Sequence, residues 1–377
     1  MKMLDSQQSD KRDLPADSCK ISNSTSLTVR SPHEADITDA TGNRGEYAVE
    51  QWDCPLCGSS EYRLSLVFPR SVHRVVKCSH CGMLRLQPRL AETELSSLYH
   101  EGYCGKPEND RPRNESVLAR IARWKQIRLV RRTHQWRLQT LERHTSRRRL
   151  LEVGCGDGGF LSFLHARGWE VTGIDFSAHA ARIARARGIE VFLADFARTE
   201  LPPNTFPLVV AYHVLEHVYH LDKFMTQVHR ILAPNGILVA AVPNAASLGA
   251  RLFGNRWIGW AVPYHVNLFT PETLTKILQR KAFRVRDVEH WSPGAGAIWK
   301  VGAKASVRAV LFRDRGSPGV VARAKPPTGQ DASDASIPAR TVLIDLLADP
   351  AFTCLGFADR LFHMGSTMTI VAEKLPQ

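Results

Sequence analysis

The segment LLEVGCGDGGFL, residues 150–161, places four glycines and two acidic residues between two apolar runs. Gly154, Gly156 and Gly159 fit the spacing GxGxxG, which is typical of a tight turn between a buried strand and a helix. Such a turn binds a nucleotide cofactor in some proteins and only connects a strand to a helix in others. In both cases it restricts the chain to a fold in which strands and helices alternate.

Short apolar segments alternate with helical patterns from residue 149 onward. Helices are predicted at 159–167, 177–187 and 220–232, and a further helix begins after Thr270, a typical N-cap followed by Pro271. This alternation predicts an α/β, Rossmann-like, mostly parallel sheet with helices on both faces. The predicted strands are LLEVG, EVTGID, IEVFLAD, FPLVVAYHV, GILVAAVPN, RVRDVEHW and STMTIVAEK.

Acidic residues stand at the ends of three of these strands. Glu152 lies at the tip of the first strand, Asp175 ends the second and Asp195 follows the third. Glu152 and Asp157 would repel a pyrophosphate, so they argue against a nicotinamide dinucleotide and for a cofactor that carries an ammonium group. A plain strand-to-helix turn would not explain all three acids.

The segments LLEVGCGDGGFL, VTGID, AYHVLEHV and GILVAAVPN resemble the motifs of class I S-adenosylmethionine-dependent methyltransferases in order and spacing. The similarity is to the small-molecule branch that includes ubiquinone-biosynthesis methyltransferases, and it covers residues 149–291 and the last strand. The resemblance implies S-adenosylmethionine as cofactor and a seven-stranded sheet whose last strand is antiparallel beside the fifth. STMTIVAEK is placed to be that strand.

The resemblance implies a role for each candidate residue of the cofactor site. Glu152, Gly154 and Gly156 would contact the methionine end of S-adenosylmethionine, and Asp175 would accept hydrogen bonds from both ribose hydroxyls. The remaining cofactor-binding candidates are Phe176, Asp195 on the adenine side, and His213.

Histidines mark the expected position of the methyl acceptor. His213 and His217 flank Glu216 after the fourth strand, and His265 lies in the segment after the fifth. All three histidines are candidate catalytic bases, since the free imidazole titrates near neutral pH. Glu216 and His217 could instead fix the loop by hydrogen bonds; this pattern favours structure or cofactor positioning for His217, whereas for His213 the two roles are equally consistent. The aromatic residues around Trp260 form either a substrate lid or part of the core.

Four cysteines form two CxxC pairs, CPLCG and CSHCG. This spacing predicts a closed tetrahedral zinc site in a small zinc ribbon, with a structural rather than a catalytic ion. His73 and His80 are expected to be surface residues, and Cys19, Cys104, Cys155 and Cys354 are assigned no metal. The predicted zinc ligands are Cys54, Cys57, Cys78 and Cys81.

A basic helix is predicted over residues 114–145. The segment from Arg111 to Arg149 contains thirteen Arg or Lys residues and only two acidic residues, so it holds most of the chain's net charge of +13. Its apolar stripe, from Val117 to Leu141, predicts docking on the core, and it would also suit peripheral association with an anionic membrane. Its arginines would equally suit RNA. An RNA methyltransferase is therefore the alternative to an enzyme that methylates a small molecule on oxygen or carbon.

The 377 residues are divided into four predicted regions. These are a disordered tail (1–48), a zinc-ribbon-like module (49–90), a basic helical segment (91–146) and a methyltransferase domain (147–377) with an insertion at about 292–366. The sequence shows no transmembrane run and no secretory signal, which together with eight cysteines predicts a cytoplasmic protein with reduced thiols. The acceptor and the oligomeric state are left open.

Overall fold

The computed structural model describes residues 47–69, 71–95, 117–294, 299–303 and 364–376, together with the paired short strands β1 (Ile37–Thr38) and β2 (Arg44–Gly45). All of them belong to one compact unit, Glu34–Gln377. Most of the predicted tail and of the predicted insertion at 292–366 lies outside the described residues, as do Cys19, Cys104 and Cys354. No helix in the described part of the chain is long and apolar enough to span a membrane.

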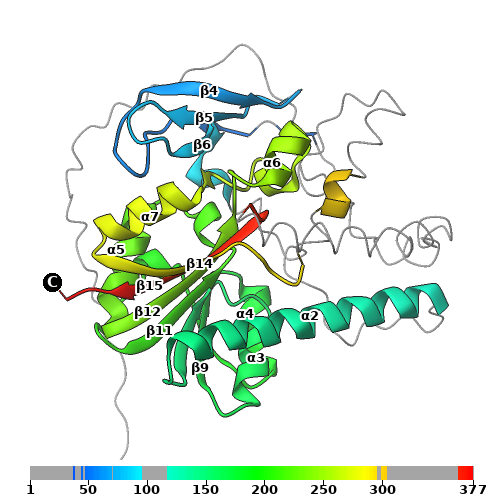
Figure 1. Ribbon diagram of the computed structural model, residues 1–377, viewed down its shortest axis with the longest axis vertical. Helices are drawn as coiled ribbons and strands as arrows, with labels where there is room; N and C mark the ends of the chain where they lie inside the picture. The colour runs from blue at the N-terminus through cyan, green and yellow to red at the C-terminus, as the bar shows by residue number, and fades with distance from the viewer. Residues whose placement is uncertain are drawn as a thin grey trace, which may run out of the picture. The chain divides into compact units, whose positions relative to one another are not determined.

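A seven-stranded sheet forms the centre of the fold (Figure 1), and its strand order is β10-β9-β8-β11-β12-β15-β14. The first five strands in this order are parallel, and β15 pairs antiparallel with both β12 and β14. The predicted Rossmann-like sheet is thus confirmed, including the insertion of the last strand beside the fifth. The strands are β8 (Arg149–Val153), β9 (Glu170–Asp175), β10 (Glu190–Leu193), β11 (Phe206–Tyr212), β12 (Leu232–Pro243), β14 (Phe283–Glu289) and β15 (Thr367–Lys374).

Both faces of the sheet are covered, because its central strands are apolar at nearly every position. Leu208 and Val210 of β11 face one core, whereas Val209 and Ala211 face the other, as expected for side chains that alternate along a strand. Helices α2 (Val117–His144), α3 (Gly159–His165) and α4 (Ala178–Ala186) contribute to the first core. Helices α5 (Leu221–Ile231) and α7 (Pro271–Arg280) contribute to the second.

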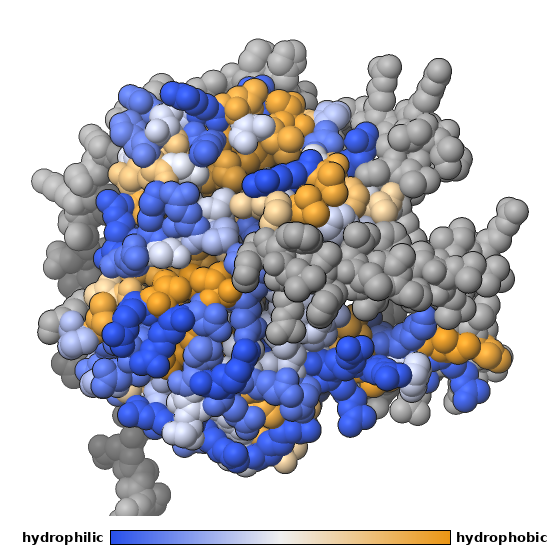
Figure 2. Space-filling view, viewed as in Figure 1, coloured by the Kyte–Doolittle hydropathy of each residue, from blue (hydrophilic) through white to orange (hydrophobic). Residues whose placement is uncertain are grey.

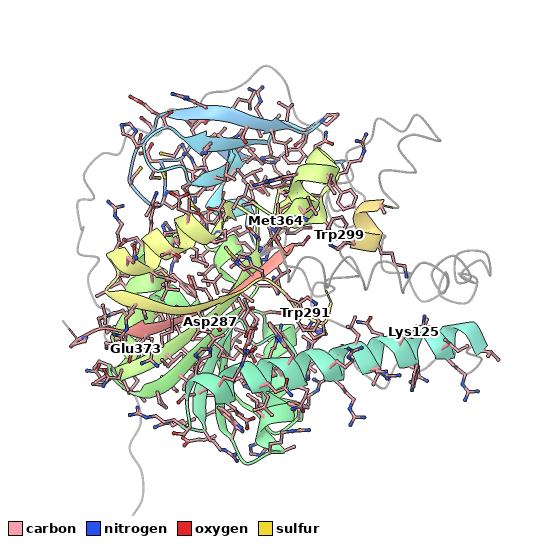
Figure 3. The ribbon with its side chains drawn as sticks, viewed as in Figure 1. Lys125, Asp287, Trp291, Trp299, Met364 and Glu373 are labelled. Carbon is pink, nitrogen blue, oxygen red and sulfur yellow. The ribbon has the colours of Figure 1, made fainter. Side chains whose placement is uncertain are left out.

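The last strand is held at its end by an ion-pair cluster. Glu373 of β15, labelled in Figure 3, accepts hydrogen bonds from Arg284 and Arg286 of the neighbouring strand β14. The two arginines are two residues apart and therefore share one face of the strand. Since Glu373 is 6% exposed, its charge is compensated mainly by these two guanidinium groups.

The cysteine module, defined as residues 49–90, is attached to the methyltransferase-like region by a shared sheet. Strands β4 (Tyr62–Val67), β5 (Arg74–Cys78) and β6 (Leu84–Gln87) form an antiparallel sheet, and β13 (Asn267–Leu268) pairs with β6 as a fourth strand. Two further strands, β3 (Val49–Glu50) and β7 (Arg89–Leu90), pair with each other. Residues far apart in the sequence therefore form one structural unit.

The segment after β12 is packed rather than open. It contains α6 (Leu248–Phe253) and two short 3-10 helices, η4 (Gly254–Arg256) and η5 (Ile258–Trp260), with Trp257 between them and Trp260 at the end of the second. Trp257 and Trp260 are buried with Phe68 and Leu86 of the cysteine module in a separate core. The structure thus supports the core interpretation of Trp260, because its ring is 6% exposed and its indole nitrogen donates to the carbonyl of Gly254.

Helix α2 docks on the core by only its C-terminal half, so the prediction that its whole apolar stripe docks is wrong. Leu138 and Leu141 are buried against the sheet, and Trp136 packs edge-on against Trp291 at a centroid distance of 6.3 Å (Figure 3). Side chains of the first half, by contrast, lie exposed among arginines (Figure 2). The exposed apolar residues are Val117, Ile121, Trp124, Ile127 and Val130.

This division of α2 predicts unequal effects of truncating its apolar residues. Leu141→Ala should reduce the free energy of unfolding by about 2–5 kcal/mol, because it leaves a cavity in a packed core. Ile127→Ala, the control in the exposed half, should change it by less than about 0.5 kcal/mol. Urea unfolding followed by circular dichroism measures both values, and equal effects would contradict half-docking.

Candidate cofactor and methyl-transfer site

The glycine turn between β8 and α3 takes the shape its sequence requires. Gly154, Gly156 and Gly158 all have positive φ angles, of 69°, 55° and 70°, which side-chain-bearing residues rarely adopt. A Cβ on Gly154 would lie 2.6 Å from Cγ2 of Val214, in the loop that follows β11. Only glycine therefore allows the turn to approach that loop.

The three acids lie at the ends of adjacent strands, because β8, β9 and β10 are neighbours in the sheet. Asp175 is 8% exposed, and its two oxygens accept hydrogen bonds from the backbone NH groups of Gly156 (2.9 Å) and Ser177 (2.8 Å). A carboxylate offers about four acceptor positions, so two remain for a ligand. Asp195 lies further out, where it accepts from the NH of Ala197 and pairs with Arg198.

Glu152 is the most unusual group of the turn. It is 4% exposed, and its Oε2 has no hydrogen-bond partner in the described part of the chain. Burial raises the pKa of this carboxyl to about 8, although the nearby Arg137 guanidinium acts in the opposite direction. A buried carboxyl of this kind is suited to a cationic ligand that would restore its charge.

Two residues beside Glu152 were not identified from the sequence. Arg137 of α2 lies over the ring of Tyr212, 3.9 Å from its centroid, and Tyr212 ends β11. Within the described residues, Arg137 Nε and the Tyr212 hydroxyl are buried without a hydrogen-bond partner. Arg137 is one of many arginines in its helix. The only feature of the sequence that could have indicated its role is that it lies next to Leu138 and Leu141, the apolar residues that dock on the core.

The loop after β11 positions the first candidate base. His213 adopts a left-handed backbone conformation (φ 59°), and its Nδ1 donates a hydrogen bond of 3.1 Å to Oε1 of Glu216. The Glu216 side chain is 1% exposed, whereas that of His213 is 47% exposed. Burial is the largest influence on Glu216 and opposes its ionisation, but the hydrogen bond from His213 and the charges of the three nearby histidines together lower the pKa of this carboxyl.

The structure brings the other two histidines together. The rings of His217 and His265 meet edge to face with centroids 4.7 Å apart. Burial lowers the pKa of His217, and it lowers that of His265 to about 4. Since a group with a pKa near 4 accepts protons poorly at neutral pH, His265 is a weaker candidate base than its position in the sequence indicated.

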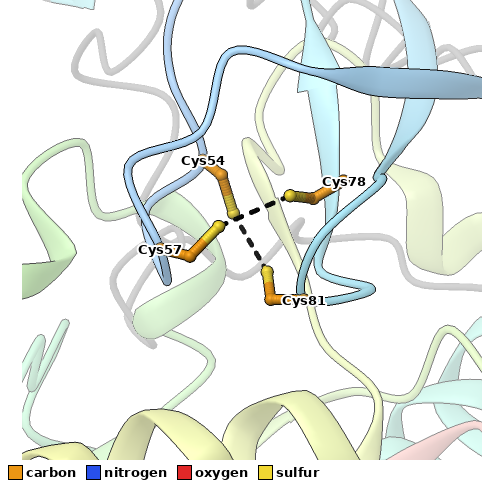
Figure 4. Close-up of side chains that lie close together, drawn as sticks. All are labelled: Cys54, Cys57, Cys78 and Cys81. Atoms are coloured by element: carbon orange, nitrogen blue, oxygen red, sulfur yellow. Dashed lines mark hydrogen bonds between the residues drawn. The ribbon is translucent and has the colours of Figure 1, made fainter.

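The four predicted metal ligands converge at one point of the cysteine module (Figure 4). Their sulfur atoms all lie within 4.8 Å of one another, with Cys54–Cys81 at 3.4 Å and Cys57–Cys78 at 3.5 Å. Burial opposes ionisation of Cys78, but the NH groups of Cys81 and His80 lower the pKa of its thiol to about 6. The donor set and its spacing fit one tetrahedral zinc ion.

The expectation that His73 is a surface residue is wrong. Its side chain is 1% exposed, and its Nδ1 donates to the carbonyl of Pro88 at 2.7 Å. His80 is exposed as expected and contacts the hydroxyl of Ser59. Neither histidine belongs to the cysteine cluster.

Comparison with known proteins finds similar methyltransferases. A methyltransferase domain family matches residues 123–288. A probable S-adenosylmethionine-dependent methyltransferase of Mycolicibacterium smegmatis is 27% identical over 169 residues, which are 44% of this chain and 63% of that protein. A ubiquinone biosynthesis O-methyltransferase of Rhizobium leguminosarum is 34% identical over 152 residues, 37% of this chain and 60% of that protein. The chain thus spans less than two thirds of the length of both relatives.

Among solved structures, a Haemonchus contortus phosphoethanolamine N-methyltransferase in complex with S-adenosylmethionine is similar, with a TM-score of 0.42 and 17% identity. The match covers 64% of this chain and 53% of that one. Residues 123–288 of the chain are thus similar to a methyltransferase domain, and the strand order and the glycine turn agree with that similarity.

Proposed function

We propose that this protein transfers a methyl group from S-adenosylmethionine to a small-molecule acceptor, on oxygen or carbon. The observation that carries the proposal is the buried Glu152, whose Oε2 has no hydrogen-bond partner among the described residues. A second support is the Rhizobium relative, whose name describes an O-methyltransferase. When bound, S-adenosylmethionine supplies a methyl carbon that its sulfonium has already activated.

Residues around the glycine turn would hold this cofactor at the two charged groups of its amino-acid end. We assign the amino group to Glu152 and the carboxylate to Arg137, which approaches the same place from α2. Asp175 would accept from the ribose hydroxyls with its two remaining acceptor positions, and Phe176 and Asp195 would lie on the adenine side. Gly154 and Gly156 let the backbone come close to the ligand.

His213 is the base that we propose for an acceptor hydroxyl. Since its Nδ1 donates to Glu216, the neutral ring presents Nε2 as the atom that accepts a proton. The Glu216 carboxylate would then stabilise the imidazolium, as the carboxylate of a Ser-His-Asp triad does. An acceptor oxygen would lose its proton to Nε2 and would then be the nucleophile for the methyl group that the cofactor supplies, with the sulfur of the cofactor as leaving group.

We also propose that the four cysteines hold a structural zinc ion. Four thiolates complete a tetrahedral shell, so no coordination position remains for a substrate. The ion would fix the turns of the cysteine module, whose strand β6 pairs with β13 close to His265. It would therefore support the acceptor side of the site through the backbone.

The raised pKa of Glu152 predicts proton release on cofactor binding. Because that pKa is about 8, Glu152 is mostly protonated at pH 7, and a bound ammonium group would favour its ionised form. Binding should therefore release up to about one proton, and affinity should rise between pH 6 and pH 8. Calorimetry in buffers of different ionisation enthalpy measures the release.

The Glu152→Gln variant separates the proton released by Glu152 from any proton released by the ligand itself. The variant should lose the proton release assigned to Glu152 and bind S-adenosylmethionine at least about tenfold more weakly. Glu142→Gln, an exposed control on α2, should behave as the wild type does. Binding of NAD with no response to S-adenosylmethionine would overturn the cofactor assignment.

His213→Asn tests the base. Asparagine tolerates the left-handed backbone of this position, so the loop should keep its shape. We expect kcat with a hydroxyl acceptor to fall about 100-fold or more and the affinity for S-adenosylmethionine to stay unchanged. The surface variant His179→Ala serves as control. An unaltered kcat in His213→Asn would remove the proposed role.

Cobalt substitution tests the zinc proposal. Co²⁺ bound by thiolates gives intense sulfur-to-metal charge-transfer absorption, which we expect at one ion per chain. Cys81→Ser should weaken this absorption strongly and lower the melting temperature, whereas Cys155→Ser, which lies outside the cluster, should leave the absorption unchanged. Absence of the band in the wild-type protein would refute the sulfur site.

A further inference from the structure

A second group of metal-binding side chains lies outside the cysteine module. Glu216 and His217 belong to the short helix η3 (Leu215–His217) after β11, and His265 comes from the segment after β12. One carboxylate oxygen and one nitrogen of each ring all lie within 4.8 Å of one another. A backbone hydrogen bond from the NH of Val266 to the carbonyl of Glu216 holds the two segments together.

The hydrogen bonds of the two histidines define which nitrogen is basic. Nδ1 of His217 lies 3.1 Å from the carbonyl oxygen of Tyr264, and Nδ1 of His265 lies 2.8 Å from that of Gly259. A carbonyl can only accept, so each Nδ1 carries the proton and each neutral ring keeps its lone pair on Nε2. Metal-binding histidines are oriented in this way by backbone carbonyls.

The carboxylate completes the set with a negative charge. Oε1 of Glu216 accepts from His213, whereas Oε2 is buried and has no hydrogen-bond partner among the residues that the structure describes. Two imidazole rings and a carboxylate with a buried oxygen that lacks a hydrogen-bond partner among the described residues thus lie together.

We propose that Glu216, His217 and His265 bind a divalent transition-metal ion. Two imidazoles and one carboxylate suit Zn²⁺, Fe²⁺ or Co²⁺ at about 2.0–2.2 Å from each ligand atom. Ligand atoms around a tetrahedral ion at these distances are about 3.4 Å apart, so on binding the three atoms would lie closer together than the 4.8 Å within which they are found. Three protein ligands leave positions for water or an acceptor oxygen.

The position of this site gives the ion a chemical role. The η3 helix follows Val214, which contacts the glycine turn, so the ion would lie on the acceptor side of the cofactor. An acceptor hydroxyl bound to the ion would lose its proton more readily, and His213 would then receive it. This role rests on the proposed methyl transfer, whereas binding of the ion does not.

Cobalt binding to the zinc-loaded protein tests the site. With the cysteines occupied by zinc, we expect one further Co²⁺ per chain, which shows ligand-field bands without sulfur charge transfer. Glu216→Gln and His265→Ala should weaken binding of this ion at least about tenfold, and His179→Ala should not change it. Metal analysis after dialysis counts the ions, and thermal melting checks that each variant folds.

A wild-type protein that takes up no cobalt beyond its zinc would overturn the proposal, as would unchanged cobalt binding in Glu216→Gln. If His265→Ala does not fold, the isosteric Glu216→Gln variant decides the question. Calorimetry with S-adenosylmethionine is run on the same samples. Loss of cofactor binding with intact cobalt binding would contradict the methyltransferase proposal alone, and the reverse result would contradict the metal site alone.

Discussion

The close approach of the glycine turn to the loop after β11 is the constraint on which the site depends. Gly154 has no room for a side chain, because its Cβ position lies against Val214. This contact joins the segment with Glu152 to the segment with His213 and Glu216. A cofactor held by the first would therefore lie next to the proposed base in the second, and proximity of this kind is the main requirement for the methyl transfer that we propose.

The acceptor side is built from three parts of the chain. His265 reaches His217 because β13 pairs with β6 of the cysteine module and because Trp257 and Trp260 anchor the same segment in a separate core. The cysteine module is thus part of the scaffold of the site. A zinc ion among its cysteines would stiffen β5 and β6, and through them the position of His265.

Helix α2 combines two different surfaces. Its C-terminal half packs on the sheet through Leu138 and Leu141 and directs Arg137 towards Glu152 and Tyr212. Its N-terminal half keeps arginines and large apolar side chains in contact with solvent. A regular apolar spacing gives a helix one continuous stripe, but only the part that lies over the sheet is buried.

Local sequence determined the positions of the strands, the glycine turn and the turn within each CxxC pair, because each depends on residues close together in the chain. Apolar runs specify buried strands, glycines permit positive φ angles, and each CxxC pair brings two sulfurs together. The tertiary structure alone decided that His265 meets His217, that Arg137 approaches Glu152, and that half of α2 is exposed. These contacts join residues from 15 to 48 positions apart or depend on where a helix meets the sheet. Burial then set the protonation of Glu152 and His265, which no local pattern could have indicated.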